Sequence, residues 1–136
     1  MTPETTTGAS IVGMILRDDV NFVALIPAEQ MKLGALPDNI ALPASLIRTI
    51  SMNERQKLVR KGLTRMIDRV SVTVRASSYR EQVRLIRLIR EGCAGKVGDI
   101  GNGKNVSILA AGTGPDLRGP GDSFEQSQDF RVSYDA

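Results

Sequence analysis

The segment 66–76 alternates its side chains so regularly that an extended strand is the local structure it fits best. From position 70 onward the even residues are apolar, as at Val70, Val72 and Val74, while the odd residues are polar. Successive side chains of a strand point to opposite faces of a sheet, so this pattern predicts one face on a core and one face in water. The segment 124–135 alternates in the same way and predicts a closing strand.

Two other segments carry apolar residues at helical spacing. The first helix is expected over about 10–25, with Ser10 as N-cap. Its polar residues Asp18, Asp19 and Asn21 are a place where it can divide. The second is expected over about 79–92, capped by Ser77 or Ser78 and ended by the glycines that follow. Its apolar side is predicted to contain Tyr79, Val83, Ile86, Ile89 and Cys93, widened by Leu85 and Leu88.

Turn residues separate these elements. The segment 28–45 predicts a loop with at most one short strand at 31–33, and 46–52 predicts an extended strand that leads into a hairpin tip over 53–64. A further strand is expected at 106–111, between glycine-rich loops.

The predicted fold class is therefore α+β. We expect two layers, an about four-stranded, mainly antiparallel sheet with two helices on one face, in the order α-β-β-α-β-β. Residues 1–8 are expected to form a flexible tail, and 9–136 a single domain with a long basic hairpin around 52–65.

Composition removes most catalytic machinery. The 136 residues include no histidine and one cysteine, Cys93, so histidine-dependent triads, ordinary zinc sites and disulfide scaffolds are not expected. Cys93 falls on the apolar side of the second helix and is predicted to be a buried structural thiol. We expect no enzyme, no cofactor, no metal, no signal peptide and no membrane association.

Charge is unevenly distributed along the chain. Residues 1–54 carry 3 basic and 6 acidic side chains (net −3), residues 55–104 carry 13 and 4 (net +9), and residues 105–136 carry 2 and 5 (net −3). A basic middle between acidic ends suggests a polyanionic partner or a self-complementary assembly, whereas the simplest alternative is a solvated surface.

The basic residues form two groups of candidate contact residues, for a neighbouring subunit, a partner or a lumen. They are Arg55, Lys57, Arg60, Lys61 and Arg65 around the hairpin, and Arg80, Arg84 and Arg87 along the second helix. Such groups can neutralise phosphates without reading sequence. Aromatic residues make up 4% of the chain and none lies between Phe22 and Tyr79, so stacking on single-stranded nucleic acid is not expected from the hairpin group. A solvated or subunit-facing loop is the favoured interpretation there.

The string GDIGNGKN at 98–105 matches part of a phosphate-binding loop. It lacks the Ser or Thr that should follow the lysine, and it follows a predicted helix and precedes a predicted strand, the reverse of the required order. A flexible turn is the favoured interpretation.

Three regions together resemble the tail-completion or tail-terminator family of long-tailed bacteriophages and phage-like particles. They are LPASLIRTIS at 42–51, VSVTVRASSYREQVRLIRLIREGCAG at 70–95, and the close of the chain, a GPDL turn at 114–117 followed by QDFRVSY at 128–134. Their order and spacing, with the first helix, extend the resemblance over most of the chain.

The resemblance implies a structural virion protein located in the tail or neck and assembled in the host cytoplasm. Its expected partners are copies of itself in a ring, typically a hexamer, the tail-tube protein that the ring caps, and the head connector or neck protein that it joins. Non-specific contact with DNA passing through the lumen is also implied. Two alternatives stay open: a small basic nucleic-acid-binding module, and another neck or minor tail protein of similar fold.

Overall fold

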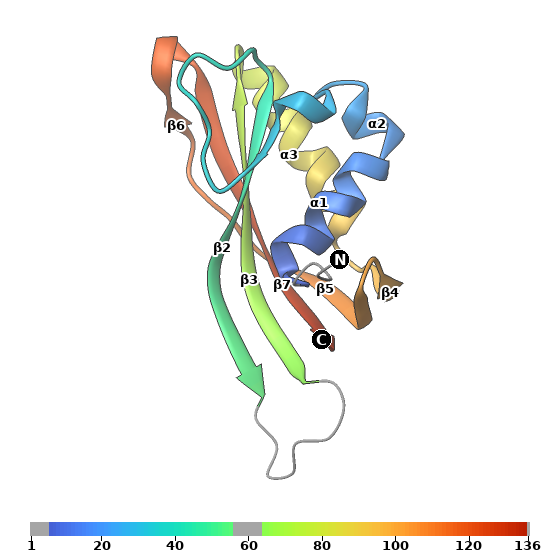
Figure 1. Cartoon of the computed structure of the whole chain (residues 1–136). Coiled ribbons are helices and arrows are strands. Elements are labelled where there is room, and N and C mark those ends of the chain that lie inside the picture. The colour runs from blue at the N-terminus through green and yellow to red at the C-terminus, as the bar shows by residue number, and fades with distance from the viewer. Residues whose placement is uncertain (1–5, 56–63, 136) are drawn as a thin grey trace.

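The computed structural model describes residues 6–55 and 64–135. The elements in chain order are α1 (Gly8–Asp18), α2 (Val20–Val23), a 3₁₀ turn (Ala28–Gln30), β1 (Met31–Leu33), β2 (Ala44–Arg55), β3 (Arg65–Ala76), α3 (Tyr79–Cys93), β4 (Val97–Ile100), β5 (Gly103–Thr113), β6 (Leu117–Arg118), a second 3₁₀ turn (Pro120–Asp122) and β7 (Phe124–Asp135). Figure 1 shows the helices gathered on one side of a long, strongly twisted sheet.

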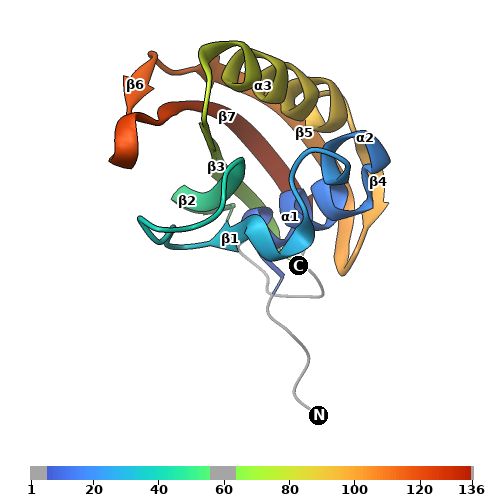
Figure 2. The same cartoon turned by 90° about the horizontal axis from the view of Figure 1, so that it is seen from above.

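The sheet has seven strands in the order β1-β2-β3-β7-β5-β4, and β6 pairs with β7 beside this path. The β1–β2 pair is parallel, and the other pairings among the described residues are antiparallel. Seen from above, the sheet curls so that α1 lies between its two edges, with β1 and β2 on one side and β4 and β5 on the other (Figure 2).

The predicted four-stranded sheet with two helices in the order α-β-β-α-β-β is wrong. The four predicted strands correspond to β2, β3, β5 and β7, but β1, β4 and β6 join them, β1 at the short strand allowed for at 31–33, and α2 adds a third α-helix. The additional strands are only two to four residues long. Strands this short are held by hydrogen bonds to a longer neighbour rather than by an apolar pattern of their own, so periodicity does not reveal them.

The first helix begins and ends differently from the prediction. Thr7, not Ser10, is the N-cap of α1, and its hydroxyl accepts a hydrogen bond from the amide of Ser10 at 3.1 Å. The carboxylate of Asp19 accepts from the amides of Asn21 and Phe22 at 3.0 and 3.3 Å. Asp19 is therefore the N-cap of α2, and the predicted helix becomes two because the first one ends before a residue that caps the second.

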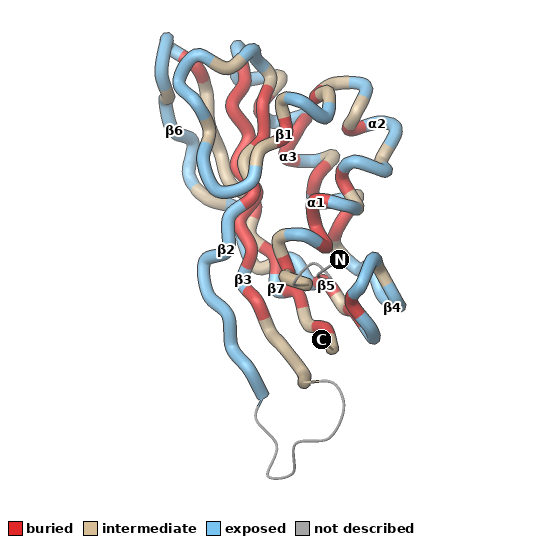
Figure 3. Tube along the Cα trace, in the orientation of Figure 1, coloured by how far each residue is buried: buried red, intermediate tan, exposed pale blue. Residues whose placement is uncertain are grey.

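The core lies between the helices and one face of the sheet. The even residues of β3 and β7 are directly opposite one another in register, and Val70, Val72, Phe130 and Val132 are fully buried against α1 and α3. Figure 3 shows the buried residues concentrated where the helices cover the sheet.

The predicted apolar side of α3 is displaced around the helix axis. Leu85, Ile86, Ile89 and Cys93 are buried, together with Gln82, whereas Tyr79 and Val83 are about half exposed. Gln82 can lie in the interior because its amide donates to Asp116 at 2.8 Å and to Gln126 at 3.0 Å. A polar residue thus occupies a position that the sequence pattern assigned to the outer side.

Candidate assembly surfaces

The distal half of β2 and β3 projects away from the helices. Every residue from Arg48 to Arg55 is exposed, and a bulge at Ile50 bends the strand where it leaves the core. Residues 56–63 connect β2 to β3 and lie outside the described residues. In Figures 1 and 3 the projecting part of β2 has no helix beside it.

The structure brings two of the predicted hairpin cations together at the end of this projection. Arg55 of β2 is directly opposite Arg65 of β3. The Arg65 guanidinium lies 3.2 Å from the Asp135 carboxylate and donates to the carbonyl of Asn105 at 2.8 Å. Arg55 is exposed and makes no ion pair within 6–55 and 64–135. The other three predicted members, Lys57, Arg60 and Lys61, lie outside the described residues.

The second predicted group lies along the exposed side of α3. Arg80, Arg84 and Arg87 are all exposed, and Arg87 pairs with Glu91 at 3.0 Å. Helix α3 begins where β3 ends, at the opposite end of the molecule from Arg55 and Arg65 (Figure 1). The length of β3 separates these two ends by roughly 36 Å, so the two basic groups do not form one patch.

The outer edge of β2 is open for most of its length. Strand β1 pairs only with the segment from Ser45 to Ile47. Beyond Ile47, as far as Arg55, no other described strand pairs with that edge, and two large apolar side chains, Ile50 and Met52, are about half exposed beside it. Unpaired backbone groups on an exposed edge are a template for pairing with another chain. Sequence reasoning missed this edge, because which strands lie beside β2 is set by long-range pairing.

The helix-free face of the sheet is held by ion pairs between β3 and β7. Three arginines of β3 pair with three acids of β7: Arg65 with Asp135 at 3.2 Å, Arg69 with Asp129 at 2.8 Å, and Arg75 with Glu125 at 2.8 Å. This face was predicted to be in water, but its upper part is covered: Arg75 is buried and donates to the carbonyl of Pro37 at 2.8 Å. The 34–43 loop therefore lies over the end of this face, which alternation within β3 could not reveal.

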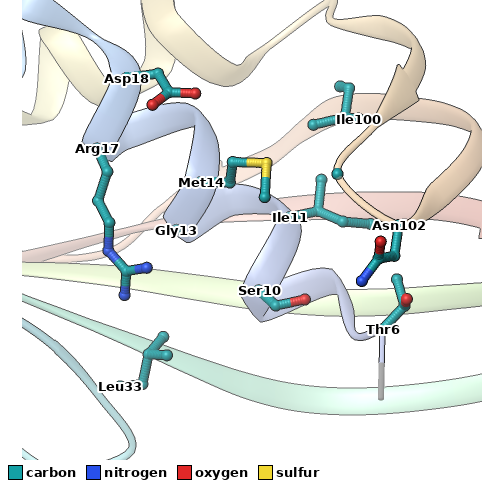
Figure 4. A pocket seen from close by; sticks show the side chains of 11 residues that line it. Thr6, Ser10, Ile11, Gly13, Met14, Arg17, Asp18, Leu33, Ile100 and Asn102 are labelled. Carbon is teal, nitrogen blue, oxygen red and sulfur yellow. The ribbon is translucent and has the colours of Figure 1, made fainter. Parts of the chain in front are cut away.

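An open cavity of about 470 Å³ runs along the exposed side of α1. Figure 4 shows Met14 and Ile11 lying toward Ile100, while Arg17 extends toward Leu33. The lining residues therefore come from β1 at one edge of the curled sheet, from α1, and from β4 at the other edge. Its titratable side chains, Arg17 and Asp18, point to different sides of the helix (Figure 4), so they form no acid–base pair for catalysis.

Cys93 is buried, which confirms the predicted structural thiol. Burial, and secondarily the charge of Asp19, raises the pKa of the Cys93 thiol to about 12. A thiol with so high a pKa carries almost no thiolate at neutral pH and is a poor nucleophile. Among the described residues, no group of three or more acidic or cysteine side chains is placed to hold a metal ion. None of the helices in the described ranges has the length and apolar character of a membrane span.

No protein-family model matches the chain, and no curated protein matches it at a significant level. Among solved structures, the fold is similar to that of a chain in the virion of the native gene transfer agent (GTA) particle. The TM-score is 0.68, the sequence identity is 13%, and the match covers 95% of each chain. At this identity the likeness establishes a shared fold over nearly the whole of both chains.

Proposed function

We propose that the chain is a structural virion protein of a phage or phage-like particle, and that it forms the ring that ends the tail tube and joins the tail to the head connector. The observation that carries the proposal is the shared fold with a chain of a gene transfer agent virion, which covers 95% of each chain. The tail-terminator role within such a particle comes from the sequence resemblance described above.

The surfaces are compatible with assembly. A ring subunit needs two different contact surfaces, because head-to-tail contacts close into a ring when the rotation between neighbours allows it. The open edge of β2 is one such surface, and the part of the α1 cavity at Ile100 and Asn102, beside the opposite edge of the sheet, is the other. The tip of the projecting β2–β3 pair, with Arg55 at its end, is assigned to the tail-tube protein.

In this proposal the partners are other copies of the chain, in a hexamer, together with the tail-tube protein and the head connector. The exposed row Arg80, Arg84 and Arg87 is assigned to contact with a neighbouring subunit or with DNA in the lumen. A contact with DNA would need no base recognition, since phosphates are neutralised by charge alone.

A tube-length assay tests the proposal. The protein is mixed with the tail-tube protein of the same particle, and tube lengths are measured by negative-stain microscopy. We expect short tubes with a ring at one end, and longer tubes without the protein. Arg55→Glu should reduce capping. Arg90→Glu makes the same change at an exposed arginine on α3, away from the projecting strands, and should not reduce it. Unchanged tube lengths with a folded wild-type protein would reject the tail-terminator role, and binding to the connector alone would favour another neck protein.

A second candidate is a small nucleic-acid-binding module, favoured by one observation. Arg80 and Arg84 are exposed on one side of α3 and have no ion-pair partner among the described residues. This module should bind duplex DNA with an affinity that falls steeply between 50 and 200 mM salt, by about 10³ or more if six or more phosphates are contacted. Absence of binding at low salt would remove this candidate.

A further inference from the structure

A second cavity of about 470 Å³ lies on the helix-free face of the sheet, and it is lined by two arginines. Arg69 of β3 and Arg131 of β7 are directly opposite one another in register. Ser51 and Asn53 of β2 and Ile67 of β3 complete much of the lining. Like charges directly opposite on neighbouring strands repel, so this arrangement is unfavourable unless an anion neutralises it.

Within the described residues, an acidic side chain pairs with only one of the two guanidinium groups. Arg69 is fixed by Asp129, whose carboxylate accepts from Nη2 at 2.8 Å and from Nε at 3.0 Å, and by the carbonyl of Ala111 at 3.0 Å. Arg131 is exposed, and no described residue forms an ion pair or hydrogen bond with its side chain. A guanidinium group presents a planar fork of donors that matches a carboxylate. The cavity therefore has the chemistry to receive one carboxylate beside Arg131.

A carboxylate suited to this role is presented at the other end of β7. Asp122 lies in the 3₁₀ turn before β7 with a φ of 59°, and its side chain is fully exposed (100%). The turn is held by Arg118, which donates to the carbonyls of Asp122 at 2.8 Å and Ser123 at 3.2 Å and lies over the ring of Phe124 at 4.2 Å. Aspartate is among the non-glycine residues that adopt the left-handed region most readily, so the turn can present this carboxylate to solvent at little cost. The nearest cation to the carboxylate, Arg118, is 3.9 Å away and exposed, which is a weak pairing.

We propose that Asp122 of one copy of the chain enters the cavity beside Arg131 of a second copy. Phe124, just after Asp122, and Arg131 are separated by roughly 23 Å of extended strand. One chain therefore cannot make this contact with itself. Because the contact joins two different residues, it can be repeated head-to-tail around a ring, whereas a two-fold dimer would make it twice between the same two copies. The proposal rests on the ring of the proposed function and identifies one of the charge contacts that would close it.

A charge exchange tests this contact. Arg131→Glu and Asp122→Arg are made singly and together, and association is measured by light scattering over a range of concentrations. Each single variant should weaken subunit association roughly tenfold, and the double variant should restore most of the loss, because the opposite charges again face each other. Arg131→Glu places a glutamate opposite Arg69, so it should not weaken folding. Arg131→Gln removes the charge without reversing it, and should also weaken subunit association, by less than Arg131→Glu.

Two matched controls separate this contact from a general charge effect. Arg90→Glu and Asp38→Arg change exposed residues on α3 and on the 34–43 loop by the same amounts, and should leave association unchanged. The proposal is overturned if the folded single variants associate like the wild type, or if the double variant does not recover. A wild type that is monomeric at every concentration also overturns it. Tube capping is measured separately, so the proposed function can survive that result.

Discussion

The phenol of Tyr134 donates a hydrogen bond to Oδ2 of Asp68 at 2.8 Å, and both side chains are fully buried. The same carboxylate oxygen accepts from the amide of Gly8 at 2.8 Å, at the start of α1. One buried acid on β3 therefore connects the first helix to the last strand. The other oxygen, Oδ1, is buried and has no hydrogen-bond partner among the described residues, so the two existing bonds are important to the stability of this site.

Tyr134→Phe should lower the free energy of unfolding by about 1–3 kcal/mol, because it removes one of the two donors to a buried carboxylate. Urea unfolding followed by circular dichroism measures the change. Tyr79→Phe is the matched control, since Tyr79 is about half exposed and keeps its edge-on contact with Phe124 after the substitution. We expect the control to change stability by less than about 0.5 kcal/mol. Equal losses for the two variants would contradict a specific role for Tyr134.

Gly8 and Gly13, both in α1, should respond to alanine in opposite directions. A Cβ at Gly8 would lie 2.8 Å from Cβ of Asp68 and 3.0 Å from Cγ2 of Val70, so Gly8→Ala should cost about 1–3 kcal/mol by forcing the helix away from β3. Among the described residues, a Cβ at Gly13 would meet only Cδ1 of Ile47, at an ordinary 3.6 Å. Gly13→Ala should therefore stabilise by about 0.5–1 kcal/mol. Thermal unfolding of both variants measures the two changes in stability. A loss for Gly8→Ala with a gain for Gly13→Ala is the result expected if α1 packs closely on β3 at Gly8 and leaves room at Gly13.

The ion pair between Arg75 and Glu125 should contribute far more than an exposed pair. Glu125→Gln leaves a buried guanidinium with a neutral neighbour and should cost about 1–3 kcal/mol. Glu91→Gln removes the partner of Arg87 on the exposed side of α3, where side chains are 60–73% exposed, and should cost less than about 0.5 kcal/mol. Denaturant midpoints for the two variants give the comparison, and similar shifts would argue against burial as the cause.

Stability should fall as pH rises above about 9. Burial raises the pKa of Cys93 from 9.0 to about 12, so the thiol ionises more readily in the unfolded chain, and its contribution is complete below pH 9 and lost as pH approaches 12. Burial and the hydrogen bond to Asp68 also raise the pKa of Tyr134, with the same sign at higher pH. Cys93→Ala should make the free energy of unfolding fall less steeply between pH 9 and 10.5, by up to about 1.4 kcal/mol per pH unit.

Thiol labelling gives an independent check on Cys93. The native protein should react with a thiol reagent far more slowly than the unfolded protein at the same pH, because the reactive thiolate is almost absent. Fast labelling of the native state would show that Cys93 is accessible and ionised.

Local pattern predicted the elements that carry their own periodicity. The alternation at Val70, Val72 and Val74 identified β3 and its buried face, and Ser78 was a correct candidate N-cap for α3. The short strand expected at 31–33 is present as β1, whereas β4 and β6 could not be predicted in the same way, because their neighbours in space determine them.

Burial of polar side chains was the other feature that local pattern missed. Gln82 is inside because Asp116 and Gln126 meet its amide, and Arg75 is covered because Glu125 and the carbonyl of Pro37 meet its guanidinium. These contacts join residues at least 34 positions apart. For the same reason local pattern did not reveal that the length of β3 separates Arg65 from Arg80, or that Arg131 is directly opposite Arg69.

The most direct test of a ring-forming virion protein is its native mass by light scattering on a sizing column, followed by negative-stain imaging of the main peak. We expect a closed ring, with a mass near six times the 14.7 kDa of one chain, either in solution or at the end of tubes formed by the tail-tube protein. A protein that stays monomeric at all concentrations, and forms no ring when that tube protein is present, would contradict the proposal.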